Sequence, residues 1–134
     1  MDGARLRSFT RQFAGAVREL HEAGVRHRDL KGENVLIADE DGKLAIRFID
    51  FDSLYFARGV SFRRAAKNLA QLAGSLPYCF PMAARLRFFA CYTNGSLLAG
   101  RRKELLRAAA AIAQLRIERW LRKWSRGRKS GAGR

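Results

Sequence analysis

The sequence predicts an α+β fold that is mainly helical and includes one small β-hairpin. Apolar residues recur at intervals of three and four in several segments, which is the period of an amphipathic helix. Two short apolar runs, at 34–38 and 43–50, flank the acidic connection Asp39-Glu40-Asp41-Gly42, and this pattern is typical of a hairpin. A chain of 134 residues, of which 48% are hydrophobic, is long enough to bury the core of one domain.

The first predicted helix covers residues 4–24. Gly24 supplies the left-handed residue that commonly ends a helix, and we expect His21 to lie on the surface. The apolar stripe of this helix, which we expect to face the core, consists of Leu6, Phe9, Phe13, Val17 and Leu20.

The middle of the chain alternates predicted loops and helices. Residues 25–34 are charged and show no period, so we expect a loop, and the stretch from Asp52 to about Ser61 also reads as irregular. Ser61 is a suitable N-cap for a helix over 61–76. Pro81 favours the start of another helix, over 82–93, which Asn94-Gly95 would close.

The charge of the chain predicts an affinity for anions. Lys and Arg number 27 against 12 Asp and Glu, which gives a net charge of +15. The two cysteines, Cys79 and Cys91, lack the spacing of a redox or zinc motif, so we expect reduced thiols in the interior. Neither a membrane-spanning run nor a signal-peptide pattern is present, which favours a cytoplasmic protein.

Residues 101–134 hold 12 basic and 2 acidic side chains, and therefore +10 of the net +15. We expect a basic amphipathic helix over 101–124 and a disordered basic end over 125–134, both following a domain over 1–100. The helix could pack on that domain, lie on an anionic membrane surface, or bind nucleic acid. Its main apolar stripe is Leu106, Ala110, Ala113, Ile117, Leu121 and Trp124, broadened by Leu105, Ala109, Ile112 and Trp120.

The residues that carry chemistry lie between His27 and Asp52. The stretch His27-Arg28-Asp29-Leu30-Lys31-Gly32-Glu33-Asn34 fits the pattern His-Arg-Asp-x-x-x-x-Asn, and Ile49-Asp50-Phe51-Asp52 follows the predicted hairpin. The first resembles the catalytic loop of protein-kinase-like enzymes, here 27–34, and the second resembles their metal-binding Asp-Phe-Gly element, here 49–52. The two in this order imply the C-terminal lobe of a protein-kinase-like fold, in which the hairpin carries the metal site.

The resemblance implies a phosphotransferase that uses ATP and Mg²⁺. Asp29 would be the catalytic base, and Lys31 would place its ammonium near the transferring phosphate. Asn34 and Asp50 would ligate Mg²⁺, which prefers hard oxygen ligands, so that Lys31, Asn34 and Asp50 together bind the nucleotide complex. His27 and Arg28 would support the loop, and we expect Glu33 to be solvated.

The sequence differs from ordinary protein kinases in features that resemble one family of kinase-like enzymes. Asp52 replaces the glycine of Asp-Phe-Gly, and no Ala-Pro-Glu follows. These features, with Asn68-Leu69 in the next helix, resemble the lipopolysaccharide kinase (Kdo/WaaP) family, whose acceptor is an inner-core sugar. The resemblance implies a lipopolysaccharide core or other sugar as acceptor. It also implies a peripheral position on the cytoplasmic face of the inner membrane. An anionic membrane acceptor explains the excess positive charge better than a nucleic-acid partner does.

Two alternatives remain open. One is a Ser/Thr protein kinase-like or small-molecule kinase, because the setting of Lys31 resembles those loops. The other is a noncatalytic basic module that uses the kinase scaffold to bind a membrane or nucleic acid. The chain lacks a Gly-rich loop and a strand lysine before the catalytic loop, so we expect the C-terminal lobe alone and weak or absent turnover by the isolated chain.

Overall fold

A computed structural model describes residues 2–50, 52, 54–59, 61–76, 80–96 and 98–131. The predicted α+β, mainly helical class is confirmed. The elements in chain order are α1 (Gly3–Glu22), β1 (Val25–His27), the 3₁₀ turn η1 (Gly32–Asn34), β2 (Val35–Glu40), β3 (Lys43–Phe48), β4 (Leu54–Phe56), α2 (Phe62–Ser75), α3 (Met82–Thr93), η3 (Ala99–Arg101) and α4 (Arg102–Gly131).

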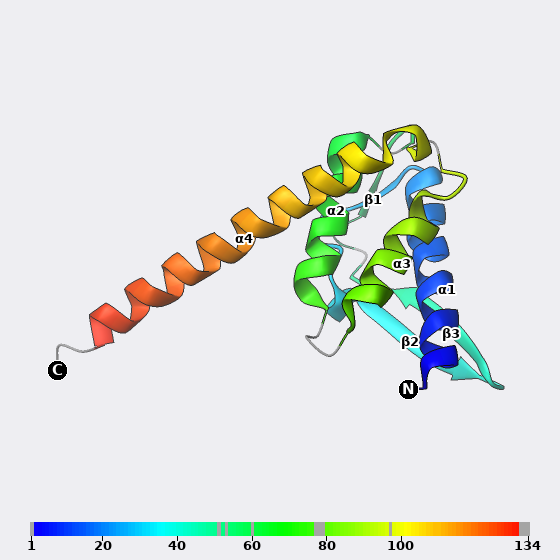
Figure 1. The fold of residues 1–134 in the computed structure, drawn as a ribbon, viewed down its shortest axis with the longest axis horizontal. Helices are drawn as coiled ribbons and strands as arrows, with labels where there is room; N and C mark the ends of the chain where they lie inside the picture. The colour runs from blue at the N-terminus through cyan, green and yellow to red at the C-terminus, as the bar shows by residue number, and fades with distance from the viewer. Residues whose placement is uncertain are drawn as a thin grey trace.

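The core lies between the helices. α1 packs against α3, and α2 packs against the first half of α4 (Figure 1). Phe13 stacks on Phe9 and contacts Phe88 of α3, while Leu105 of α4 is fully buried. Half-buried Cys91 packs against this core as a free thiol, and Cys79 lies outside the described residues. Most of the predicted stripe of α1 therefore faces the core.

The predicted hairpin is present. β2 and β3 pair antiparallel from Val35 opposite Phe48 to Glu40 opposite Lys43. Asp41 and Gly42 form the turn with φ of 53° and 80°, the left-handed pair that a tight hairpin requires. Arg5 forms an ion pair with Asp39, which ties the end of the hairpin to the start of α1 (Figure 1).

A second strand pair lies where the sequence predicted irregular chain. β1 pairs antiparallel with β4, so that His27 lies opposite Leu54. Strands of three residues are too short to show a period, and their pairing partner is distant in the sequence. The consequence for the site is that the segment after Asp52 lies against the start of the predicted catalytic loop.

The predicted helix ends match the structure closely. Ala23 caps α1 and Gly24 follows at φ 75°, and the Ser61 hydroxyl accepts a hydrogen bond from the amide of Arg64 at 3.2 Å. Pro81 precedes α3, and Gly95 follows its last turn at φ 71°. Local chain signals were sufficient at these positions because caps are made by residues close in sequence.

The last helix differs from the prediction in length. α4 continues to Gly131, past Trp124 and through most of the segment predicted to be disordered. Arg and Lys are good helix formers, and an existing helix extends at little cost. Its first part packs on the domain, through Leu105, Ala109 and Ile112, and the remainder projects away (Figure 1). None of the described helices is long and apolar enough to cross a membrane.

Candidate phosphotransfer site

The site begins where β1 ends, at the fully buried His27. The amide of Asp29 donates to His27 Nδ1 at 3.2 Å, so Nδ1 is an acceptor and the ring proton is on Nε2. His27 Nε2 donates to the carbonyl of Ile49 at 3.1 Å. This ring therefore joins the turn that carries Asp29 to the chain just before Asp50.

Asn34 and Asp29 are fixed relative to each other. Asn34 is buried, and its Nδ2 donates to the Asp29 carbonyl at 2.8 Å. The bond orients the amide so that Oδ1 is free to accept, and no hydrogen bond from another described residue reaches that oxygen. The amide of Ile49 donates to the Asn34 carbonyl at 2.9 Å, which returns the end of the hairpin to this loop.

Lys31 lies over the Asp29 carboxylate. Its Nζ is 3.1 Å from Asp29 Oδ2 and 3.5 Å from Glu33 Oε2. The hydrogen bond to Asp29, with the charges of Asp29 and Glu33, raises the pKa of Lys31. The lysine is therefore a permanent cation beside a carboxylate that is 41% exposed and open to a substrate.

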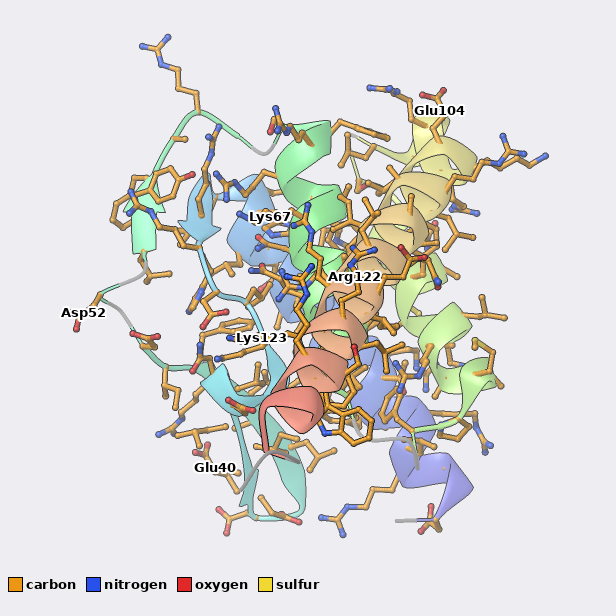
Figure 2. All side chains as sticks on the ribbon, turned by 90° about the vertical axis from the view of Figure 1, so that its left-hand side faces the viewer. Glu40, Asp52, Lys67, Glu104, Arg122 and Lys123 are labelled. Carbon is orange, nitrogen blue, oxygen red and sulfur yellow. The ribbon has the colours of Figure 1, made fainter. Side chains whose placement is uncertain are left out.

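Asp50 follows directly after the anchored Ile49. Its φ of 67° is a left-handed conformation that costs a non-glycine residue free energy and that aspartate tolerates better than most. Asp50 is exposed, and no hydrogen bond or ion pair joins its carboxylate to another described residue. Phe51 lies outside the described residues, and Asp52 is exposed (Figure 2).

A buried polar network supports the loop from behind. Asn68 of α2 is fully buried, and its Nδ2 donates to the His27 carbonyl at 2.9 Å and to Gln71 Oε1 at 2.8 Å. Gln71 in turn donates to the Arg28 carbonyl at 2.9 Å. Two successive carbonyls of the loop are therefore satisfied by one face of α2.

The network extends to His21, whose expected surface position was wrong. His21 is 1% exposed; its Nε2 donates to Asn68 Oδ1 at 3.0 Å, and its Nδ1 accepts from the Tyr92 hydroxyl at 2.7 Å. His21 follows Val17 by four residues, so the helical period of the buried stripe already contained the signal. The helix turns this position to the core, where α2 and α3 supply its partners.

Burial sets the protonation of this pair. Loss of solvation lowers the pKa of His21, against the opposing hydrogen bond to Asn68, and also raises the pKa of the Tyr92 hydroxyl. Both groups are neutral near pH 7. The loop is therefore held by a neutral hydrogen-bonded chain that crosses three helices.

The oxygens near the loop suit a hard cation. Asn34 offers a carbonyl-type oxygen with its Nδ2 already used. Asp50 offers a carboxylate that pairs with no other described residue, on the chain that Asn34 and His27 anchor. Such oxygens are the ligands that Mg²⁺ takes, with water and phosphate oxygens completing the coordination. The donor set fits the metal that the sequence pattern implies.

The arrangement defines a kinase-type fold, and comparison with known proteins identifies the family. The family model described as the protein kinase domain matches residues 1–83. The chain belongs to the protein kinase domain family. It is 46% identical over 54 residues to calcium-dependent protein kinase 13 of Oryza sativa and 53% identical over 51 residues to the hormonally up-regulated neu tumor-associated kinase of Mus musculus.

These alignments cover only part of each protein. They include 40% and 38% of this chain, but 10% and 7% of the two kinases. The solved structure of WaaP in complex with acyl carrier protein matches with a TM-score of 0.64 at 24% identity, over 83% of this chain and 51% of that chain. The fold of this chain is therefore that of about half of WaaP, as the resemblance to the Kdo/WaaP family implied.

Proposed function

We propose that this chain is the catalytic lobe of an ATP-dependent kinase that transfers a phosphoryl group to a hydroxyl of a lipopolysaccharide-type sugar. The observation that carries the proposal is the link between Asp29 and Asn34, together with the return of Ile49 to both ends of the loop. These contacts support a site in which Asp29 would be the base and Asn34 and Asp50 would be the oxygen ligands, because they join the loop at 27–34 to the chain just before Asp50. Phosphoryl transfer depends mainly on such positioning and on charge.

In this proposal Asp29 accepts the proton of the attacking hydroxyl and orients it in line with the γ-phosphate. Its backbone is held by His27 and Asn34, and its carboxylate, paired with Lys31, is 41% exposed and can be reached by the acceptor. Asn34 and Asp50 would hold Mg²⁺, which would neutralise charge on the phosphates. Lys31 keeps its proton because of its acidic neighbours and would exchange Asp29 for a phosphate oxygen when the nucleotide binds.

Two lines of support favour a sugar acceptor. The sequence pattern around Asp50 and Asp52 resembles the Kdo/WaaP family, and the matched solved fold is that of WaaP. The chain spans about half of that structure, so the acceptor and the activity of the whole protein belong to this proposal.

A Ser/Thr protein kinase is the second candidate. Its support is the similarity to curated protein kinases, which reaches 53% identity over 51 residues. The two candidates differ in acceptor and share the phosphotransfer chemistry. An assay with both a lipopolysaccharide core and a protein substrate separates them.

The catalytic test uses the longest natural polypeptide that contains this chain. It is supplied with Mg²⁺ and with ATP that is labelled at the γ-phosphate. Asp29→Asn removes the proposed base, and we expect kcat to fall by about 10²–10⁴-fold. Glu33→Gln is the matched control, since Glu33 is on the same loop, also contacts Lys31, and is 79% exposed. We expect less than about a threefold change there. Unchanged transfer by Asp29→Asn would refute the assignment of the base.

We also propose that the projecting half of α4 contacts an anionic membrane. Arg119, Arg122, Lys123 and Arg126 line one shallow depression on it. Figure 2 shows Arg122 and Lys123 on this part of the helix. Trp120 stacks on Trp124, and both residues are at least half exposed. Basic side chains beside exposed indoles are typical of helices at a membrane surface. The net positive charge of the helix disfavours association with a second copy of itself.

Vesicle co-sedimentation tests this contact. We expect binding to vesicles of anionic lipid and much weaker binding to neutral vesicles. Arg122→Glu with Lys123→Glu should weaken anionic binding by at least about tenfold. The same charge change on exposed positions of α1, Arg7→Glu with Arg11→Glu, is the control and should weaken it less than about threefold. Equal loss in both pairs would show a general charge effect and exclude a specific role of α4.

A further inference from the structure

Three arginines converge on one tyrosine beside the candidate site. β1 and β4 pair so that Tyr55 lies opposite Arg26, and Arg28, just past the end of β1, also reaches the Tyr55 ring. Arg64 reaches the same ring from the first turn of α2 and donates from Nη2 to the Tyr55 hydroxyl at 2.6 Å. The guanidinium carbons of Arg26, Arg28 and Arg64 lie 5.6, 5.0 and 5.6 Å from the ring centre.

This arginine cluster has no acidic counterpart in the described part of the chain. No described carboxylate lies within 4.0 Å of any of the three guanidinium groups; the ion pairs present engage other basic side chains. Arg26 Nε is buried without a hydrogen-bond partner among the described atoms. Cation–π contact with one ring offsets only part of the mutual repulsion of three such cations.

The positive charge of the cluster lowers the pKa of the Tyr55 hydroxyl. Arg26 beside the hydroxyl, followed by the charges of Arg64 and Arg28, holds the pKa of Tyr55 below its usual 10.0. The arginines therefore stabilise negative charge on the phenol oxygen. They would stabilise a bound phosphate more strongly, because guanidinium groups bind phosphate oxygens in a planar two-point geometry.

The position of the cluster relates it to the site. Arg28 is exposed and directly precedes Asp29 in the chain, so the cluster includes the neighbour of the proposed base. The Arg28 carbonyl is fixed by Gln71, which holds this residue in the same network as the loop. A molecule that presents its hydroxyl to Asp29 would therefore have the cluster beside it for an anionic group of its own.

We propose that Arg26, Arg28 and Arg64, with Tyr55 as the floor, bind a phosphate group carried by the sugar acceptor. The acceptor part of this statement rests on the proposed function; the binding of a phosphate monoester does not. The cluster would then select acceptors that already carry a phosphate over neutral sugars.

The test is calorimetric titration of the whole chain at low salt, without ATP, with a hexose 6-phosphate, the matching neutral hexose and inorganic phosphate. We expect saturable binding of the hexose phosphate and none of the neutral hexose. Arg64→Gln should weaken hexose phosphate binding by at least about tenfold. Arg63→Gln removes the same charge from the same turn at an exposed position and should change it less than about twofold.

Two further measurements distinguish a loss of binding from misfolding of a variant. Circular dichroism should be the same for both variants, and Arg26→Gln should repeat the loss seen with Arg64→Gln. Absence of saturable hexose phosphate binding by the natural chain, or equal losses in Arg63→Gln and Arg64→Gln, would overturn the proposal. Inorganic phosphate bound as tightly as the hexose phosphate would overturn its acceptor part. Because no nucleotide is present, a failure of the proposed kinase activity leaves this result unchanged.

Discussion

Buried polar residues connect the helices to the candidate site one hydrogen bond at a time. Asn68 contacts His21, Gln71 and the His27 carbonyl, and each of its polar atoms is used. A buried amide with every partner present specifies one arrangement of its neighbours, because any other arrangement leaves a polar atom without a partner. The geometry of the loop therefore depends on side chains from α1 and α2 that are remote from Asp29.

His21 should make the stability of the fold sensitive to acid. Its ordinary pKa is 6.5, and burial lowers the pKa in the folded state. As pH falls below 6.5, the unfolded chain binds the proton first, so the free energy of unfolding falls until the lower folded pKa is passed. We expect the melting temperature of the natural chain to fall more steeply from pH 7.5 to pH 5 than that of His21→Gln.

The same variant should be less stable at pH 7.5 by about 1–3 kcal/mol, because it disturbs the partners of Tyr92 and Asn68. Subtracting the two melting profiles removes the contribution of the carboxylates, which both proteins share. Parallel profiles for the two proteins would exclude His21 as the titrating group.

At the scale of elements, α4 carries two different apolar stripes. Leu105, Ala109 and Ile112 face the domain, whereas Leu106 and Ile117 belong to the stripe that the sequence favoured and are 41% and 50% exposed. Both stripes have helical spacing, so the period alone does not say which one meets the core. The contact with α2 decides it.

Adjacent leucines on α4 test this assignment. Leu105→Ala should lower the free energy of unfolding by about 2–5 kcal/mol, since it opens a cavity in the core. Leu106→Ala should change it by less than about 0.5 kcal/mol, since Leu106 is 41% exposed and lies outside the core cluster. Chemical denaturation of both variants measures the difference. Similar losses at the two positions would contradict the observed rotation of the helix.

Gly24 controls the passage from α1 to β1. At its φ of 75° an added Cβ would lie 1.9 Å from the Ala57 carbonyl oxygen, in the strand-pair region that brings β4 to the loop. We expect Gly24→Ala to destabilise the fold by more than about 2 kcal/mol, through both the backbone conformation and the contact.

Gly15→Ala is the matched substitution inside α1, where an added Cβ meets nothing within 4 Å. It should stabilise the fold by about 0.5–1 kcal/mol, because alanine loses less conformational entropy in a helix. Thermal or chemical unfolding of the two variants should give changes of opposite sign. A loss of stability in Gly15→Ala equal to that in Gly24→Ala would contradict this account.

At the scale of the whole molecule, a packed domain and a projecting helix are distinct parts (Figure 1). The core residues of α4 end near Ile112, and the basic depression begins at Arg119. The domain core and the surface proposed to meet a membrane therefore use different parts of the same helix.

A chain that ends after Arg116 should keep the fold of the domain. We expect its melting temperature to stay within about 5 °C of that of the full chain, since few core contacts are lost. A chain that ends at Gly100 loses Leu105 and Ala109 and should no longer unfold cooperatively. Calorimetry distinguishes the two. Loss of cooperative melting in the longer chain would show that the projecting half stabilises the domain.

The sequence by itself determined the helices, the hairpin turn and the kinase-type motifs, because each depends on residues within a few positions of one another. The family of the chain is confirmed, whereas the roles of Asp29, Lys31, Asn34 and Asp50 stay predictions. Only the tertiary structure decided the pairing of β1 with β4, the partners of the buried His21 and the face of α4 that meets the core. It also brought Arg64 to Tyr55 and Arg28. These features depend on contacts between distant segments, which local period and spacing do not encode.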